Sequence, residues 1–207
     1  FGLYLRHASR TVLMNIINAI KTGDVKRAPR LEAMLSKAIE TNKQRELTYV
    51  RQATIDALTG CKNRRAFDSD IAALMNDHQP FALALVDIDN FKSINDTWGH
   101  LNGDIVLRNV AREGLQVLQP LEISLYRYGG EEFAVVFPAE HIDNARTLLE
   151  TWRVNVERRT WREDGLTVTF SAGLGEWNME PLDKLVVSVD EALYKAKQQG
   201  KNRILRA

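Results

Sequence analysis

The chain has 207 residues, which is enough for one ordinary domain plus an appendage. Its 28 basic and 27 acidic residues leave a net charge of +1, so no general basic field would attract nucleic acid or a membrane surface. The single cysteine, Cys61, excludes an internal disulfide and fits a reducing compartment, and no apolar run approaches the roughly 20 residues of a membrane-spanning helix.

Residues 1–55 are expected to be helical and to differ from the rest of the chain. A spacing of three and four residues predicts one apolar face, formed by Leu13, Ile16, Ile17 and Ile20. The segment 22–24 breaks this helix, and Pro29 is typical of the first turn of a second one. The second helix continues the spacing only weakly as a heptad, through Leu31, Leu35, Ala38, Asn42, Arg45 and Tyr49.

Two interpretations of residues 1–55 remain open. They could form a helical hairpin that packs on its own domain. They could instead form a stalk that joins an upstream sensor to the rest of the chain and pairs with a second copy. We favour the stalk because the helix is long, polar and N-terminal. The chain begins with Phe1 rather than Met, so we also expect a fragment of a longer protein.

From Asp56 the pattern changes. Residues 56–60 are rich in turn formers, and they precede an amphipathic helix that carries Phe67, Ile71, Leu74 and Met75. Residues 81–86 form a short continuous apolar run, which is typical of a buried strand, and the run ends in Asp87-Ile-Asp89. Two helices, at 91–96 and 105–118, are then predicted to be joined by a loop at 99–103.

The next segment predicts a β-hairpin, because apolar alternation flanks Arg127-Tyr-Gly-Gly-Glu-Glu-Phe133 on both sides. A helix at 141–159, a strand at 166–170 and a helix at 182–199 come next, and residues 203–205 could add a last short strand. This order contains a split β-α-β unit of the ferredoxin-like kind. We therefore predict an α+β fold with a central antiparallel sheet flanked by helices.

In that topology the first strand and the hairpin are neighbours, so Asp87 and Glu131 are expected to point at the same small volume. A pair of carboxylates is what Mg²⁺ commonly takes from a protein, with water and substrate phosphate in the other positions. The backbone carbonyl of Ile88 is a candidate further ligand. Gly129 and Gly130 would let a phosphate or a base approach the main chain closely.

A basic pair lies near the end of the last predicted helix. Lys197 and Lys201 are four residues apart, so they are expected on one helical face, where they could hold a polyphosphate. The alternative is a solvated basic helix end favoured by the helix dipole. For this pair taken alone, the alternative is the simpler interpretation.

Five blocks of the sequence match one known family in order. They are Asp56-x-Leu-Thr-Gly60 with Asn63-Arg64-Arg65, Asp87-Ile-Asp-x-Phe-Lys-x-Ile-Asn-Asp96, Gly99-His100 with Gly103-Asp104, Arg127-Tyr-Gly-Gly-Glu-Glu-Phe133, and Ala192-Leu-Tyr-x-Ala-Lys197 with Gly200-Lys-Asn-Arg203. Through them residues 56–205 resemble the GGDEF domain of bacterial diguanylate cyclases, in its GGEEF form. The resemblance implies a domain at 56–207 with a palm-like fold related to nucleotidyl cyclases and polymerases. It also implies condensation of two GTP molecules into cyclic di-GMP with release of pyrophosphate.

The resemblance assigns catalytic roles. Asp87, the Ile88 carbonyl and Glu131 are implied to bind two Mg²⁺ ions, for which Mn²⁺ can substitute. Glu131 is also the candidate base for the attacking 3′-hydroxyl, and Glu132 is a supporting carboxylate. Lys92 is implied to stabilise charge on the phosphates during transfer.

Substrate-binding roles are implied in the same way. The resemblance implies that Asn95, His100 and Asp104 bind guanine and that Lys197 holds the triphosphate. Lys201 stands where the family usually has Arg, so the charge survives but bidentate phosphate contact is lost. Guanine presents an N1–H and an N2 amine donor, which an acceptor such as Asp104 suits, whereas adenine would leave that carboxylate unpaired.

Each such domain binds one GTP, so the resemblance implies a homodimer, regulated through the helices at 1–55 by an upstream sensory domain. It also implies a bacterial cytoplasmic location, with any membrane anchor outside this chain. Many members of the family carry an Arg-x-x-Asp product-binding site shortly before the glycines. Here the corresponding stretch is Pro120-Leu-Glu-Ile123, so we predict no feedback inhibition through that site. Two alternatives stay open, namely an inactive GTP- or cyclic di-GMP-binding signalling module and another Mg²⁺-dependent nucleotide condensation.

Overall fold

A computed structural model describes residue 14 and residues 28–207 of the chain. The chain divides into two compact units, residues 1–52 and residues 53–207. The helix predicted around residues 13–20 and the break predicted at 22–24 lie outside the described residues, apart from Met14. Among the described residues, no helix is both long and apolar enough to cross a membrane.

The first unit is described through α2, a helix at Ala28–Thr54 that agrees with the predicted second helix. Its 27 residues correspond to a length of roughly 40 Å at the usual rise per residue. Two large apolar side chains on it, Ile39 and Tyr49, are 59% and 65% exposed. A helix of this length that leaves such side chains uncovered is available to pair with something else, as the stalk interpretation requires.

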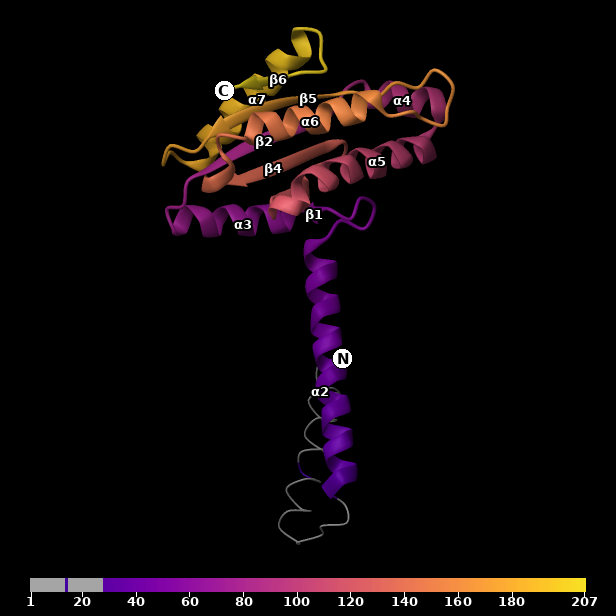
Figure 1. The fold of residues 1–207 in the computed structure, drawn as a ribbon, viewed down its shortest axis with the longest axis vertical. Coiled ribbons are helices and arrows are strands. Elements are labelled where there is room, and N and C mark those ends of the chain that lie inside the picture. Colours follow the sequence, from indigo (N-terminus) through magenta and orange to yellow (C-terminus); the bar gives the residue numbers. More distant parts are fainter. Residues whose placement is uncertain (1–13, 15–27) are drawn as a thin grey trace. The chain divides into compact units, whose positions relative to one another are not determined.

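A six-stranded sheet forms the centre of the second unit, in the order β1-β3-β4-β2-β5-β6 (Figure 1). Neighbouring strands from β3 to β5 run antiparallel, whereas the short edge strands β1 and β6 pair in parallel with β3 and β5. The predicted α+β class and the central antiparallel sheet are therefore confirmed. The strands are β1 Lys62–Asn63, β2 Phe81–Ile88, β3 Ser124–Arg127, β4 Glu132–Pro138, β5 Phe170–Glu176 and β6 Ile204–Arg206.

Helices cover both faces of this sheet. They are α3 Arg64–Asn76, α4 Phe91–Trp98, α5 His100–Leu118, α6 Ala145–Arg158 and α7 Leu182–Gln198, with short 3-10 turns at Gln119–Leu121 and Ala139–His141. Helices α5 and α6 share one hydrophobic core with the even-numbered residues of β2 from Ala82 to Ile88. Helices α3 and α7 share the other core with Phe81, Leu83 and Leu85. Residues 81–86 of β2 are all apolar because both faces of the strand are buried there, as the sequence predicts.

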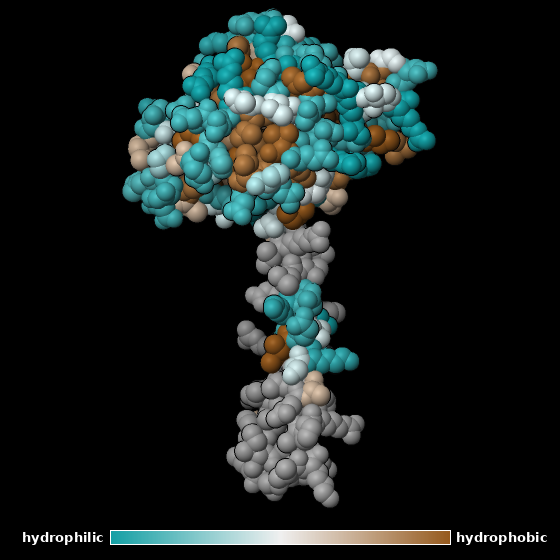
Figure 2. Space-filling view, viewed as in Figure 1, coloured by the Kyte–Doolittle hydropathy of each residue, from teal (hydrophilic) through white to brown (hydrophobic). Residues whose placement is uncertain are grey.

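The surface of the second unit is mostly hydrophilic on the face shown in Figure 2, with a large apolar patch near the centre and smaller ones elsewhere. The interior beneath is closely packed. Gly114 of α5 illustrates this, because a Cβ there would lie 2.8 Å from side-chain atoms of both Leu125 and Trp152. The Trp152 indole also donates a 2.9 Å hydrogen bond to the carbonyl of Val110, which joins α6 to α5.

Two predicted elements were wrong. The segment 99–103 is not a loop, because α5 already begins at His100 and only Gly99, with a φ of 82°, separates it from α4. The predicted strand at 166–170 is largely irregular, and β5 begins where it was expected to end. The sequence does not predict β5 because the strand is rich in small residues and glycines, which are not typical of strands. Gly173 is required there because a Cβ would lie 2.0 Å from the Val189 carbonyl oxygen of α7.

Candidate active site

The end of β2 lies beside the tip of the hairpin between β3 and β4. Asp87 is paired in register with Glu132 of β4 and with Ser171 of β5. One residue further along, the Ile88 amide donates a 3.4 Å hydrogen bond to the backbone carbonyl of Glu131. The topology thus brings together Asp87, Ile88, Glu131 and Glu132, which come from segments about 40 residues apart.

Negative charge is concentrated at this end of the sheet. Burial raises the pKa of Asp87, its ion pair with Lys197 opposes the rise, and Glu131 and Asp89 add to it. Burial likewise raises the pKa of Glu132, which Asp87 and Glu131 raise further and Lys197 lowers. Two neighbouring carboxylates with raised pKa values indicate a site where a cation would be bound favourably.

Lys197 is the nearest cation to these carboxylates. Its ammonium group lies 2.8 Å from Oδ2 of Asp87, and both side chains are largely shielded from solvent. The lysine comes from the last turn of α7, which packs along β5 and β2. The structure therefore places the residue expected to hold a triphosphate within contact distance of the carboxylate expected to hold a metal.

The donor set at the end of β2 fits a magnesium ion. Among residues 28–207, no three His, Cys, Asp or Glu side chains are grouped as a metal cage. Magnesium does not need one, because it is usually held by one or two carboxylates together with substrate phosphates and water. Asp87, Glu131 and the Ile88 carbonyl supply hard oxygen donors of this kind, and burial raises the pKa of Asp87 although Lys197 is paired with it.

Arg127 links the hairpin tip to the segment that begins at Asp56. Its guanidinium donates two hydrogen bonds to the Gly130 carbonyl, at 3.2 and 2.9 Å, and pairs with the carboxylate of Asp56 at 3.2 Å. Asp56 in turn accepts hydrogen bonds from the backbone and the hydroxyl of Thr59. Burial alone would raise the pKa of Asp56, but these hydrogen bonds and the Arg127 charge lower it overall. Both motifs were recognised in the sequence, but their contact was not predicted, because 71 residues separate Arg127 from Asp56.

The two glycines of the tip differ in what surrounds them. A Cβ on Gly129 would lie 2.5 Å from a carboxylate oxygen of Glu132, whereas a Cβ on Gly130 would meet nothing within 4 Å. Neither has a positive φ, so the backbone conformation does not demand glycine at either position. Gly129 therefore makes room for a protein side chain, while Gly130 leaves open space next to Glu131.

A second group of predicted residues lies between α4 and α5. The carboxamide of Asn95 sits over Gly103, since a Cβ on that glycine would lie only 1.9 Å from Asn95 Oδ1. Asp104 is the next residue, partly exposed, with Arg108 3.9 Å from its carboxylate. His100 is exposed at the first position of α5. The structure brings Asn95 and Asp104 to the same junction of two helices, which is the arrangement that a shared ligand would require.

The two other predicted phosphate-binding lysines, Lys92 and Lys201, lie outside α7. Lys92 is exposed in the first turn of α4. The prediction that Lys201 continues the helical face of Lys197 was wrong, because α7 ends at Gln198 and the chain turns at Gly200, whose φ is 110°. Lys201 lies in the turn beyond, where its ammonium donates to Oδ1 of Asn90, immediately after the end of β2.

Asp89 was not among the predicted site residues. It is 4% exposed and is one of only two buried polar or charged residues identified in the described part of the chain. Its carboxylate accepts hydrogen bonds from Thr169, Ser171 and the backbone of Asn202. The Asp-x-Asp pattern was visible in the sequence, but nothing in it showed that the first Asp faces the site while the second is enclosed.

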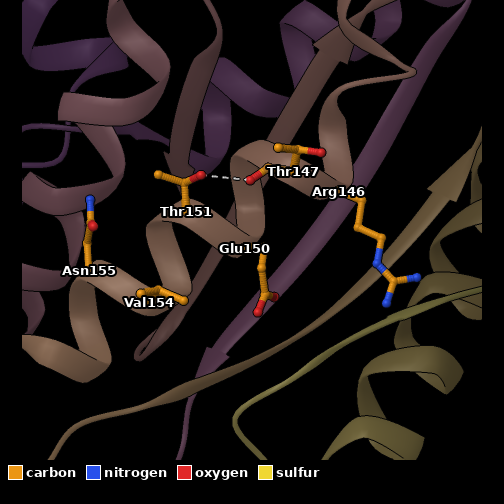
Figure 3. A pocket seen from close by; sticks show the side chains of 6 residues that line it. All are labelled: Arg146, Thr147, Glu150, Thr151, Val154 and Asn155. Atoms are coloured by element: carbon orange, nitrogen blue, oxygen red, sulfur yellow. Dashed lines mark hydrogen bonds between the residues drawn. The ribbon is translucent and has the colours of Figure 1, made fainter.

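A hollow elsewhere contains none of the predicted site residues. It has a volume of about 440 Å³ and runs along the outer side of α6 (Figure 3). The only hydrogen bond drawn there joins the Thr151 hydroxyl to the Thr147 carbonyl within the helix, at 2.9 Å. Its lining residues are Arg146, Thr147, Glu150, Thr151, Val154 and Asn155. No convergent charges mark it as a second reaction centre.

Comparison with known proteins gives consistent matches. The family model described as "Diguanylate cyclase, GGDEF domain" matches residues 53–203. Diguanylate cyclase VdcA of Vibrio cholerae is 40% identical in a 161-residue alignment that covers 75% of this chain and 47% of VdcA. Diguanylate cyclase DgcM of Escherichia coli is 38% identical in a 176-residue alignment that covers 82% of this chain and 42% of DgcM. The chain thus spans about half the length of the curated relatives it matches.

Solved structures agree. The coiled coil and GGDEF domain of DgcB from Caulobacter crescentus, in complex with c-di-GMP, is 34% identical with a TM-score of 0.77, over 87% of this chain and 100% of that one. Diguanylate cyclase SiaD from Pseudomonas aeruginosa, in complex with its activator SiaC, is 29% identical with a TM-score of 0.71, over 99% and 89% of the two chains. With the family model covering residues 53–203, well over half of the sequence, the chain belongs to the GGDEF-domain diguanylate cyclase family.

Proposed function

We propose that this chain is the catalytic part of a diguanylate cyclase, which converts two GTP molecules into cyclic di-GMP and two pyrophosphates. The observation that carries the proposal is the convergence of Asp87, Glu131 and Lys197 at the end of β2, next to the open space at Gly130. Family membership supports the same chemistry, as do the relatives named as diguanylate cyclases. Phosphoryl transfer depends mainly on positioning and charge neutralisation, and this site offers both.

In the proposed reaction, the 3′-hydroxyl of one GTP attacks the α-phosphorus of the other. A new P–O bond forms, the bond between the α-phosphorus and the bridging oxygen to the β-phosphorus breaks, and pyrophosphate leaves with that electron pair. A second identical step closes the ring. The Glu131 carboxylate is proposed to accept the hydroxyl proton, and Glu132 to keep negative charge beside it.

Family members use a divalent metal ion, and we propose two Mg²⁺ per site here, with Mn²⁺ as a substitute. When bound by Asp87, Glu131 and the Ile88 carbonyl, these ions would neutralise phosphate charge and lower the pKa of the attacking hydroxyl. Lys197 is proposed to exchange its contact with Asp87 for the β- and γ-phosphates. Lys92 and Lys201 would then face the same phosphates from the two turns that adjoin the end of β2.

The base is proposed to bind between α4 and α5. Asp104 would accept from the N1–H and N2 amine of guanine, and Asn95 can pair with either a donor or an acceptor. Gly103 supports this assignment, because it is the position that lets Asn95 and Asp104 lie together. His100 lies at the start of α5, four residues before Asp104 and therefore on the same side of the helix.

We also propose that the enzyme acts as a homodimer that the N-terminal helices control, since one domain positions one GTP. The exposed apolar side chains of α2 support pairing with a second copy. The related structures of DgcB, with its coiled coil, and of SiaD, with its activator, support regulation from outside the domain. The free, buried Cys61 and the GTP substrate fit a cytoplasmic location for this part of the protein.

The test is to incubate the purified chain with GTP and Mg²⁺ at several protein concentrations and to separate the products by chromatography. Cyclic di-GMP should form at a rate that rises faster than linearly with protein, because two domains must meet. Asp87→Asn should abolish the product, whereas the exposed substitution Asp143→Asn should leave it unchanged. Tight binding of GTP without any product would instead favour the inactive signalling module.

A further inference from the structure

Asp89 is a buried carboxylate that the proposed reaction does not use. Its Oδ1 accepts a 2.7 Å hydrogen bond from the Ser171 hydroxyl. Its Oδ2 accepts one of 2.7 Å from the Thr169 hydroxyl and one of 3.0 Å from the backbone amide of Asn202. A buried carboxylate is retained only when such donors compensate its lost hydration. Two of the three donors belong to β5 and its approach, but the third belongs to a turn near the C-terminus.

That turn has an unusual backbone. Gly200, Lys201 and Asn202 have φ values of 110°, 63° and 48°, so three consecutive residues adopt positive φ. For Lys201 this conformation is unfavourable and persists only where surrounding contacts enforce it, whereas asparagine adopts it more readily. The Asn202 amide that donates to Asp89 is one such contact. Its side chain makes two more with α6, accepting from Arg153 at 2.6 Å and donating to Glu157 at 2.7 Å.

The two turns are joined a second time. Asn90, directly after Asp89, has a φ of 57°, and its side-chain oxygen accepts from the ammonium of Lys201, directly before Asn202. The 89–90 turn and the 201–202 turn are thus joined by one partly buried and one exposed hydrogen bond. The first turn leads from Asp87 into α4 and Lys92, and the second comes after α7 and Lys197.

We propose that Asp89 is a positioning residue for the triphosphate end of the substrate, acting by fixing the turn that carries Lys201. This rests on the proposed function, because it assumes that GTP phosphates lie at the end of β2. Guanine binding should be independent of Asp89, since Asn95 and Asp104 are held together by the packing of α4 on α5 at Gly103. Substitution of Asp89 should therefore change the affinity for the triphosphate and leave the affinity for the guanine base unchanged.

The positioning role and simple electrostatics predict opposite changes in phosphate affinity when Asp89 is removed. Removing a carboxylate close to the phosphate site should strengthen phosphate binding if only electrostatics mattered, because like charges repel. A positioning role predicts the reverse, because the Lys201 turn would relax and its ammonium would no longer be held beside the end of β2. Direct repulsion of the phosphates thus cannot explain a loss of phosphate affinity on removal of Asp89, and a weaker attraction for Mg²⁺ is distinguished from positioning by repeating the measurement without the metal.

The experiment compares Asp89→Ala with the double substitution Thr169→Ala and Ser171→Ala, which empties the other side of the same cluster. Binding of a GTP analogue with a methylene group between the α- and β-phosphorus, and of GMP, is measured by calorimetry with the whole chain, both in Mg²⁺ and with Mg²⁺ removed by a chelator. Both variants should lower Tm. Only Asp89→Ala should weaken the triphosphate analogue, by about tenfold, while GMP affinity changes less than about twofold in each.

The outcomes are distinct. Equal losses for the two ligands in Asp89→Ala, or no loss for the analogue, would overturn the inference. If that variant does not fold, Asp89→Asn decides, because its amide oxygen makes only a neutral hydrogen bond with the Asn202 amide, weaker than the charge-assisted one, and it should give a smaller loss confined to the triphosphate. An Asp89→Asn protein with unchanged or tighter analogue binding would overturn the inference. If the wild-type chain binds neither ligand, the proposed function fails, and the inference fails with it.

Discussion

At the end of β2 charged groups determine the geometry of the site, whereas between α4 and α5 close packing determines it. The proposed catalytic end comprises Asp87, Ile88, Glu131, Glu132 and Lys197, and the pKa values of two of these carboxylates, Asp87 and Glu132, are raised by burial and by neighbouring carboxylates. The proposed guanine end, comprising Asn95, His100, Gly103 and Asp104, depends on a glycine that lets two helices meet. The two ends should therefore fail in different ways when they are altered.

The largest effect is expected from Asp87→Asn. Loss of the proposed metal-binding charge should lower kcat by about a thousandfold or more, since metal stabilisation of phosphoryl transfer is worth several kcal/mol. Stability at neutral pH should hardly fall. The pKa of Asp87 is raised on folding, so the folded state favours its protonated form, and Asn resembles that form.

The measurement for Asp87→Asn is a pair of assays, cyclic di-GMP formation and thermal unfolding, with Asp143→Asn as the surface control. The wild-type protein should gain stability from this group as the pH falls towards the ordinary Asp value of 3.8, and the variant should lack that gain. If the variant stays active, Asp87 is not needed for the reaction, and the proposed contrast between the two ends of the site does not hold.

Gly103→Ala should damage the guanine end instead. The added Cβ would overlap Asn95 Oδ1, so the carboxamide must move away from the proposed base site. We expect KM for GTP to rise by about tenfold while kcat changes by less than about threefold, because the carboxylates and Lys197 are untouched. Steady-state kinetics check this, and a fall in kcat with unchanged KM would show that the two ends are not independent.

The two glycines of the hairpin tip should also differ in how their substitution affects stability and activity. Gly130→Ala should leave Tm within about 1 °C of the wild type, because a Cβ there meets nothing in the protein, yet lower activity about tenfold by occupying space next to Glu131. Gly129→Ala should lower both, since its Cβ would displace the Glu132 carboxylate. Unchanged activity in Gly130→Ala would mean that the substrate does not approach the tip.

Asp56→Asn tests the support beneath the catalytic end. It weakens the pairing with Arg127 and should cost about 1 kcal/mol of unfolding free energy at neutral pH, measured by urea unfolding. The pKa of Asp56 is lowered on folding, so its contribution is present above the ordinary value of 3.8 and is lost as the pH falls through the lower folded value. The gap between the two proteins should therefore close in acid, and a gap that persists would exclude this cause.

The smallest effect is expected from the product itself. In place of Arg-x-x-Asp, this chain has a 3-10 turn at Gln119–Leu121, a left-handed Glu122 and a buried Ile123. Added cyclic di-GMP should thus leave the initial rate unchanged apart from weak competition with GTP. Strong noncompetitive inhibition would reveal a product-binding surface that involves neither end of the site.

The sequence predicted the apolar strand β2, the hairpin and most helices because each carries its own local periodicity. It missed β5 because Gly173 is dictated by contact with α7, which no local pattern reveals. It misplaced Lys201 because helical spacing was extended past Gly200. At the site, motifs identified the residues, but the ion pair of Lys197 with Asp87 and the enclosure of Asp89 depend on tertiary packing and became visible only in three dimensions.

The hydrogen bond from the Ile88 amide to the Glu131 carbonyl is the last rung of the ladder between β2 and β4. Two of the proposed metal-binding residues thus meet through one backbone contact, which belongs to a strand pair enclosed at the centre of the sheet. The reacting geometry should consequently persist for as long as the sheet does. Thermal inactivation and thermal unfolding should therefore occur at the same temperature, and no folded but inactive form should appear below it.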